Sequence, residues 1–368
     1  MSRVVLPVDR LDELWPLAPG AKVGALLHGA STTGDLVNTL DVLERLQANG
    51  RIDLTALFGP QHGFLGHTQD NMIEWSGFRH SRLGIPVYSL YGEHREPTPE
   101  MLEGLDAIFV DLVDIGTRYY TFIWTLLLCM KACEKAGVHV IVADRPNPIN
   151  GVTTEGKPQN PDYLSFVGLH PIPVRHGKTI GELAQQFQAE RFPNCELTVL
   201  PMSGWERSMW LDQTGLPFVM TSPNMPTLDS ATVYPGMCLL EATNLSEGRG
   251  TTRVFELFGA PWIDSEDFTR ELNAQQLPGC KFRAVGFEPT FQKHARQPCQ
   301  GAFLHVLDRE AFQPYATGIE IIRTARRMYP DDFAWKPPPY EYEHEKLAIE
   351  ILTGSRLMQN FSPDSEFS

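Results

Sequence analysis

Short, continuously apolar runs recur through the first half of the chain, and most are followed by a segment with helical spacing. Such runs are typical of strands in a parallel sheet, which helices cover on both faces. The leucine spacing predicts a helix over Gly34–Ala48, and the apolar segment Tyr120–Ala136 predicts another that ends at Gly137. This alternation predicts an α/β fold with a Rossmann-like, doubly wound and mostly parallel sheet. The expected strands are Ala21–Leu27, Asp53–Phe58, Pro86–Leu90, Ala107–Asp111 and His139–Ala143.

The second half of the chain has a different composition. After about residue 193, prolines and glycines become frequent and loops separate the apolar runs. Helices are expected over Ser265–Gln276 and Gly318–Met328, and strands over Lys281–Val285 and Ala302–Val306. A chain of 368 residues is long enough for about two domains. We therefore expect residues 1–193 to form the Rossmann-like domain and residues 194–368 to form a smaller α+β domain that contributes to a cleft between the two.

The balance of charge excludes several partners. The chain has 31 Lys and Arg against 45 Asp and Glu, a formal net charge of −14, which repels nucleic-acid phosphates and anionic lipid. The N-terminal segment holds acids and prolines where a signal peptide needs an unbroken apolar stretch. The most apolar run, Phe122–Met130, is far shorter than the roughly 20 residues that span a bilayer. We expect no nucleic-acid or membrane partner and a cytoplasmic location, or a chain that lacks the leader of an exported protein.

Polar side chains follow four of the expected strands at the point where each strand ends. In an open parallel sheet, ligands bind outside the carboxyl ends of the strands. Any one of these residues could simply cap the next helix, but the four strand ends together favour a shared site. The residues are His28 after the first strand, His62 after the second, Asp111, Asp114 and Arg118 after the fourth, and Asp144, Arg145 and Asn147 after the fifth.

Several kinds of site lack their sequence motif. No GxGxxG follows the first strand, and neither GxxxxGK[ST] nor GxSxG occurs, so no cofactor and no serine nucleophile are expected. The six cysteines form no CxxC pair, so no zinc or redox motif is present. Carboxylate oxygens can hold a divalent cation, although nothing in the spacing requires one. A metal-dependent hydrolase of another small substrate is the alternative, and its ligands would be His62, Asp111, Asp114 and Asp144.

A glycine-rich polar loop in the second half supplies further carboxylates. Glu241 and Glu247 bracket the segment ATNLS, and the loop continues through Arg249. Glycoside hydrolysis needs one acid that protonates the leaving oxygen and a second group that acts as nucleophile, base or electrostatic stabiliser. A solvated turn with ordinary acids is the alternative for each glutamate. The loop and the strand ends together favour glycosidase chemistry.

Six longer strings resemble the exo-β-N-acetylmuramidase family, glycoside hydrolase family 171, formerly catalogued as a domain of unknown function. They are LFGPQHGFLG (57–66), VDLVDIGTRYYTFIWT (110–125), VADRPNPING (142–151), FVGLHPIPVRHGKTIGELA (166–184), SPNMPTLDSATVYPG (222–236) and EATNLSEGRGTTRVFELFGAPW (241–262). The resemblance implies a Rossmann-like domain with a smaller auxiliary domain. It also implies an exo-acting hydrolase in cell-wall recycling, which releases N-acetylmuramic acid from the non-reducing ends of small peptidoglycan-derived saccharides.

The resemblance also suggests which side chains form the site. We predict Asp114 and Glu241 as the acid and base, Glu247 as a third candidate, and His62 and Asp144 as supporting residues. Substrate binding is assigned to Arg118, Arg145, Asn147, His176, Asn224, Asn244 and Arg249. The three arginines are candidates for the lactyl carboxylate of muramic acid, because a guanidinium binds a carboxylate with two hydrogen bonds.

One position departs from the family pattern. Many relatives carry Glu where this chain has Gln61, in GPEHGF against GPQHGF. A glutamine cannot ionise or donate a proton as an acid does. If the family's acid is that Glu, this chain uses another carboxylate or has a different activity. A non-catalytic amino-sugar-binding protein is therefore a third hypothesis.

Overall fold

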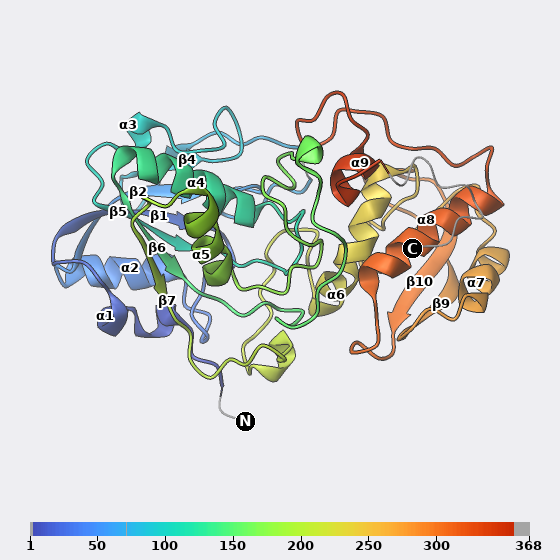
Figure 1. Cartoon of the computed structure of the whole chain (residues 1–368), viewed down its shortest axis with the longest axis horizontal. Coiled ribbons are helices and arrows are strands. Elements are labelled where there is room, and N and C mark those ends of the chain that lie inside the picture. The colour runs from blue at the N-terminus through green and yellow to red at the C-terminus, as the bar shows by residue number, and fades with distance from the viewer. Residues whose placement is uncertain (1–2, 71, 357–368) are drawn as a thin grey trace. The chain divides into compact units, whose positions relative to one another are not determined.

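The computed structural model describes residues 3–70 and 72–356, which form two compact units (Figure 1). Among the described residues, the first unit takes in those up to Gly116, followed by Tyr120–Val152 and Gly177–Pro223. The second unit takes in Thr117–Tyr119, Thr153–His176 and residues 224–356.

The first unit contains one sheet of seven strands: β1 (Ala21–Leu27), β2 (Ile52–Gly59), β3 (Phe78–Arg79), β4 (Pro86–Ser89), β5 (Ala107–Asp111), β6 (His139–Ala143) and β7 (Leu197–Leu200). Their order is β3-β4-β2-β1-β5-β6-β7. Neighbours are parallel except β3 and β4, which are antiparallel. The chain adds strands on one side of β1 and then returns to add β5, β6 and β7 on the other side. The predicted Rossmann-like, doubly wound sheet is confirmed.

Helices cover both faces of this sheet. At alternate positions of β1, Val23, Ala25 and Leu27 face one side, in a buried apolar cluster with residues of α1 (Leu11–Leu14) and α2 (Thr39–Ala48). On the other side, α4 (Phe122–Ala136) and α5 (Ile180–Arg191) lie next to each other and contact β6 (Figure 1). The rings of Trp124 and Phe187 join these two helices at a centroid distance of 5.9 Å. A short helix, α3 (Pro99–Leu102), packs against α4.

Local signals explain where these helices begin and end. Thr179 and Glu182 form a capping box at the start of α5, and Gly137 ends α4 in the left-handed conformation. The predicted helix over Gly34–Ala48 is too long at its start, because α2 begins only at Thr39. The side chain of Thr33 instead accepts hydrogen bonds from the amides of residues 35 and 37, which holds this segment in a turn.

The second unit contains a smaller antiparallel sheet in the order β8-β10-β9, with β8 (Leu257–Ala260), β9 (Cys280–Phe287) and β10 (Cys299–Val306). Its helices are α6 (Leu228–Met237), α7 (Ser265–Ala274), α8 (Pro314–Met328) and α9 (Ala348–Thr353). The Phe258 ring packs between those of Phe268 and Phe282, at centroid distances of 6.1 and 6.2 Å. The predicted smaller α+β domain is confirmed as a fold class, and the structure adds that its sheet is antiparallel.

The boundaries of the two compact units do not coincide with the change in composition near residue 193. That change marks the end of α5, but β7 follows it and pairs with β6 as an edge strand of the large sheet. The loops up to Pro223 also belong to the first unit, whereas Thr153–His176 belongs to the second. Within the described part of the chain, no helix has the length and apolar character needed to cross a membrane.

Candidate active site

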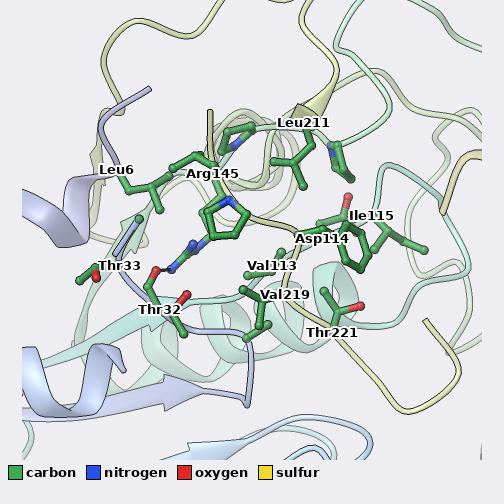
Figure 2. Close-up of a pocket in the computed structure, with 17 residues that line it drawn as sticks. Leu6, Thr32, Thr33, Val113, Asp114, Ile115, Arg145, Leu211, Val219 and Thr221 are labelled. Carbon is green, nitrogen blue, oxygen red and sulfur yellow. Dashed lines mark hydrogen bonds between the residues drawn. The ribbon is translucent and has the colours of Figure 1, made fainter. Parts of the chain in front are cut away.

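A pocket lies in the first unit where the order of the strands reverses, at the carboxyl ends of β1 and β5 (Figure 2). Its wall comes from three strand ends, from the later segment 211–221 and from Leu6 near the N-terminus. The lining residues are Leu6, Ala30, Thr32, Thr33, Gly34, Val113, Asp114, Ile115, Arg145, Pro146, Pro148, Leu211, Leu216, Pro217, Phe218, Val219 and Thr221. This is the position at which doubly wound sheets bind their ligands.

Arg145 lines this pocket and forms an ion pair with Asp111. Its Nε donates to Asp111 Oδ1 at 2.5 Å, and its Nη2 donates to Asp111 Oδ2 at 2.8 Å and to the carbonyl of Thr32 at 2.7 Å. Asp111 is completely buried and accepts a further hydrogen bond from the Thr39 hydroxyl at 2.6 Å. The guanidinium is therefore fixed in place and its charge is neutralised by a carboxylate of the protein.

Asp114, predicted as a catalytic carboxyl group, also lines the pocket. Its Oδ2 accepts the amide proton of Gly116 at 2.7 Å. Gly116 has a φ of +83°, and a Cβ there would lie 2.5 Å from the side-chain oxygen of Asn147, so this turn requires glycine. Asn147 in turn accepts from the amide of Ile149 and donates to the carbonyl of Lys178. The predicted residue Asn147 thus packs against the turn that carries Asp114.

His28 lies beside this turn, although sequence reasoning gave it no role. Its Nε2 accepts the amide proton of Val113 at 3.0 Å, so the ring proton is on Nδ1. Burial, with Arg145 as a further cause, lowers the pKa of His28 to about 3, so the ring is neutral at physiological pH. The rule for strand ends named His28 as the residue directly after the first strand, but gave it no specific function.

Gln61 and His62 follow β2 but are not part of the pocket lining. The amide of Gln61 donates to the Tyr91 hydroxyl at 3.0 Å and accepts from the Thr121 hydroxyl at 2.5 Å. His62 has a φ of +69°, and its Nδ1 lies 2.8 Å from the carbonyl of Thr68, to which it donates. The amide of Gln61 is therefore matched to a buried network of neutral groups.

Asp144 follows β6 and stabilises the start of α5. Its carboxylate accepts from the amides of Gly181 and Arg145 at 2.8 and 3.0 Å and from the Thr179 hydroxyl at 3.1 Å. Burial raises the pKa of Asp144 to about 6, although these hydrogen bonds favour the carboxylate. These contacts anchor the segment next to Arg145, and the supporting role of Asp144 in catalysis stays a prediction.

In the second unit, the predicted loop residues form a buried network of charges. Arg249 donates to Glu241 at 2.6 Å, and its Nε lies 3.1 Å from Glu247. Lys293 donates to Glu247 at 2.8 Å, and the Tyr340 hydroxyl donates to Glu241 at 2.8 Å. Sequence reasoning missed Lys293 and Tyr340, because no motif surrounds them and they lie far along the chain.

The charges of this network compensate one another. Burial disfavours the anion of Glu247, but Lys293 and Arg249 outweigh it and hold the pKa of Glu247 below its usual value. Burial likewise opposes the cation of Arg249, but Glu241 and Glu247 raise its pKa above the usual range. Gly248, with a φ of +78°, allows the loop to turn where a Cβ would lie 2.5 Å from the carbonyl of Leu257.

Two other predicted residues of the second unit, Arg118 and Asn244, donate to backbone carbonyl groups. Arg118 is completely buried and donates to the carbonyls of Lys157, Ile172 and Leu352. Asn244 donates to the carbonyl of Asp332 at 2.7 Å and accepts from the amide of residue 334 at 3.0 Å. His176 and Asn224 are buried. The contacts of Arg118 and Asn244 stabilise neighbouring loops.

The metal alternative has no matching arrangement. Across residues 3–70 and 72–356, no group of three or more His, Cys, Asp or Glu side chains is placed to hold a metal ion. Asp111 is engaged by Arg145 and Thr39, and Asp144 accepts from the start of α5. The four suggested ligands therefore do not converge.

Family models match almost the whole chain. Residues 23–229 match the model described as exo-β-N-acetylmuramidase NamZ, N-terminal, and residues 232–361 match its C-terminal counterpart. A curated relative, peptidoglycan β-N-acetylmuramidase NamZ of Bacillus subtilis (strain 168), is 47% identical over 314 residues. The match covers 85% of this chain and 75% of that protein.

Two crystal structures from Bacteroides fragilis NCTC 9343 are similar to this chain. One DUF1343 family protein has a TM-score of 0.85 at 32% identity, over 97% of this chain and 90% of its own. A second DUF1343 family protein has a TM-score of 0.71 at 24% identity, over 99% of this chain and 93% of its own. The second comparison concerns the fold alone.

Proposed function

Because this chain belongs to the exo-β-N-acetylmuramidase NamZ family, we propose that it is an exo-acting glycoside hydrolase that releases N-acetylmuramic acid from the non-reducing ends of peptidoglycan fragments. The resemblance inferred from the six sequence strings is confirmed by the family models, which together match residues 23–229 and 232–361. The proposed substrates are small peptidoglycan-derived saccharides, in keeping with the name of the Bacillus subtilis relative.

One observation carries the proposal for the chemistry: the Asp114 carboxyl group lines a pocket at the reversal point of the sheet. Glycosidases need a carboxyl group at the scissile bond, and a pocket with few charged groups gives such a group a stronger effect than open solvent does. The turn through Gly116 and the buried side chain of Asn147 support its position. We propose Asp114 as an acid or base of the reaction.

The second unit supplies the other proposed carboxylates. Glu247 is held as an anion by Lys293 and Arg249, so it suits electrostatic stabilisation and not proton donation. Glu241 accepts from Arg249 and Tyr340 through its two oxygens. We propose Glu241 as a second catalytic carboxylate, with Glu247 orienting Arg249.

The substrate test uses two disaccharides that differ in their order. One carries N-acetylmuramic acid at the non-reducing end, and the other carries N-acetylglucosamine there. We expect release of a monosaccharide from the first only, measured by chromatography. Release from both disaccharides, or cleavage inside longer chains, would contradict the exo-muramidase proposal.

The residue test uses Asp114→Asn and Glu241→Gln, assayed on an aryl N-acetylmuramide. Asp53→Asn is the matched control, because Asp53 is exposed at the opposite end of β2. General acid and base groups contribute about 10² to 10⁴ in rate, so both site variants should lose activity while the control retains it. Rates like the wild type in both site variants would refute this assignment.

Gln61 favours a second candidate, a non-catalytic amino-sugar-binding protein. Its amide is engaged by neutral hydroxyl groups, and it stands where many relatives carry an acid. Calorimetry with N-acetylmuramic acid separates the two functions: binding without turnover of the disaccharide would favour the binder. Turnover by the wild-type chain would exclude it.

We also propose a cytoplasmic location, in which small fragments taken up by the cell would be the substrates. Fractionation of cells that produce the full-length protein tests this. The protein should be recovered in the cytoplasmic fraction, and recovery from the medium or the cell wall would contradict the proposal.

A further inference from the structure

We propose that the pocket of the first unit binds the 2-acetamido group of the substrate sugar, and that Arg145 serves this neutral group and not the lactyl carboxylate. The inference rests on the proposed function, because it names which part of the proposed sugar enters the pocket. The pocket of the first unit would then select substrates by the size of their N-acyl group.

The charges around the pocket argue against a carboxylate as its ligand. Arg145 is the cation in the lining, and Asp111 neutralises it with two hydrogen bonds. Asp114 lines the same pocket, so the three groups sum to −1 when Asp114 is ionised and to zero when it is protonated. A second carboxylate would enter without a surplus of positive charge. A neutral amide meets no such penalty.

The remaining lining fits the methyl end of an acyl group. Apolar residues between positions 211 and 219 form one stretch of the wall, and Val113 and Ile115 add apolar surface after the end of β5. Those of the first stretch are Leu211, Leu216, Pro217, Phe218 and Val219. Figure 2 shows Leu211 and Val219 together with Arg145 and Asp114 around the pocket. Small apolar pockets with a few placed polar groups are typical ligand sites.

Arg145 has the donor that an acyl oxygen needs. Its hydrogen bonds to the described residues use Nε and Nη2 and leave Nη1 for a ligand. The side chain keeps 8% of its surface exposed and lines the pocket. Since Asp111 and Thr32 hold the guanidinium in one orientation, Nη1 is a preorganised donor for the carbonyl oxygen of an acetamido group.

The test widens the pocket and lengthens the acyl group. Val219 is half-buried in the lining, and Val219→Ala makes room for about one more methylene. One methylene in such a pocket changes kcat/KM by about tenfold or more. We expect the ratio of kcat/KM for the N-propionyl over the N-acetyl aryl muramide to rise about tenfold in Val219→Ala. The matched control is Val152→Ala, at an exposed valine outside the lining, where the ratio should stay at the wild-type value.

A second comparison asks whether the pocket senses the lactyl group. Removing the lactyl group from the free sugar, to give N-acetylglucosamine, should change the Kd measured by calorimetry by the same factor in the wild type and in Val219→Ala. An unchanged acyl ratio in Val219→Ala would overturn the inference. So would a variant that alters the discrimination of the lactyl group and not that of the acyl group.

Binding separates failure of the inference from failure of the proposed function. Calorimetry measures the Kd of free N-acetyl and N-propionyl muramic acids. The quotient of these two Kd values reports the preference of the pocket for one acyl group without any turnover. A tenfold shift of this quotient in Val219→Ala without any turnover supports the acetamido pocket and refutes the hydrolase. Turnover with no shift refutes the pocket and leaves the hydrolase. Absence of binding of either sugar refutes both.

Discussion

The guanidinium of Arg145 donates two hydrogen bonds to the carboxylate of Asp111, from Nε at 2.5 Å and from Nη2 at 2.8 Å. Asp111 ends β5 and Arg145 follows β6, so the pair joins two neighbouring strands at the edge where the pocket lies. The hydroxyl of Thr39, at the start of α2, donates a further hydrogen bond to the same carboxylate. This ion pair therefore fixes the pocket wall and removes the free charge of the arginine.

Removing the charge of one partner of this ion pair should lower the free energy of unfolding strongly. Asp111→Asn leaves a buried guanidinium with no compensating charge, and such losses cost about 3–5 kcal/mol. The double variant Asp111→Asn with Arg145→Gln replaces the pair by two neutral amides, and we expect it to recover more than half of the lost free energy of unfolding. Urea denaturation measures both. A double variant as unstable as the single one would contradict the role given to the charge.

The raised pKa of Asp144 predicts how the free energy of unfolding depends on pH. Its pKa of about 6 lies above the unfolded value near 4, so the folded state binds the proton more tightly. The contribution of this group to stability is present below about pH 4 and is lost as the pH rises through 6. Relative to Asp144→Asn, the wild type should lose about 2 to 3 kcal/mol between pH 4 and pH 7. Denaturation of both proteins across this range measures the difference, and parallel curves would contradict it.

Lys293 should stabilise the second unit through Glu247. Lys293→Met leaves Glu247 with one of its two cationic partners in a buried position, so we expect a loss of about 3 kcal/mol at pH 7. The loss should shrink as the pH falls through the lowered pKa of Glu247, because the protonated acid no longer needs the cation. The exposed Lys281→Met is the control. An equal loss at low and neutral pH would contradict the pairing.

His28 should act on the reaction through the amide of Val113. His28→Leu removes the acceptor at 3.0 Å, which loosens the turn that carries Asp114, so kcat should fall about tenfold with little change in KM. His28→Gln keeps an acceptor oxygen and should retain most of the activity. Because the ring is neutral with a pKa of about 3, neither variant should move the pH profile between 5 and 8. A shifted profile would show that His28 itself exchanges a proton.

Much of the fold could be predicted, because a strand buried on both faces is an unbroken apolar run. The expected strands Ala21–Leu27, Ala107–Asp111 and His139–Ala143 match β1, β5 and β6 at both ends. The start of α2 was wrong by five residues, because the hydrogen bonds of Thr33 that hold the preceding turn leave no periodic signal. The role of β7 was missed, since a short edge strand carries a weak pattern.

The candidate site could be predicted in part. The rule for strand ends found Asp114 and Arg145, which both line the pocket. The pairing of Arg145 with Asp111 spans 34 positions in the sequence and depends on which strands are neighbours, so no local motif records it. The apolar wall around Val219 comes from a loop without a motif, although four apolar residues in a row, Leu216 to Val219, were a signal that could have been used.

Turnover of an aryl β-N-acetylmuramide by the wild-type chain and by Asp114→Asn tests the proposed activity most directly. We predict that the wild type releases the aryl group and that kcat falls at least a hundredfold in Asp114→Asn, while urea denaturation shows the variant to be folded. Equal rates for the two proteins would contradict the role of Asp114, and no release by the wild type would contradict the glycosidase itself.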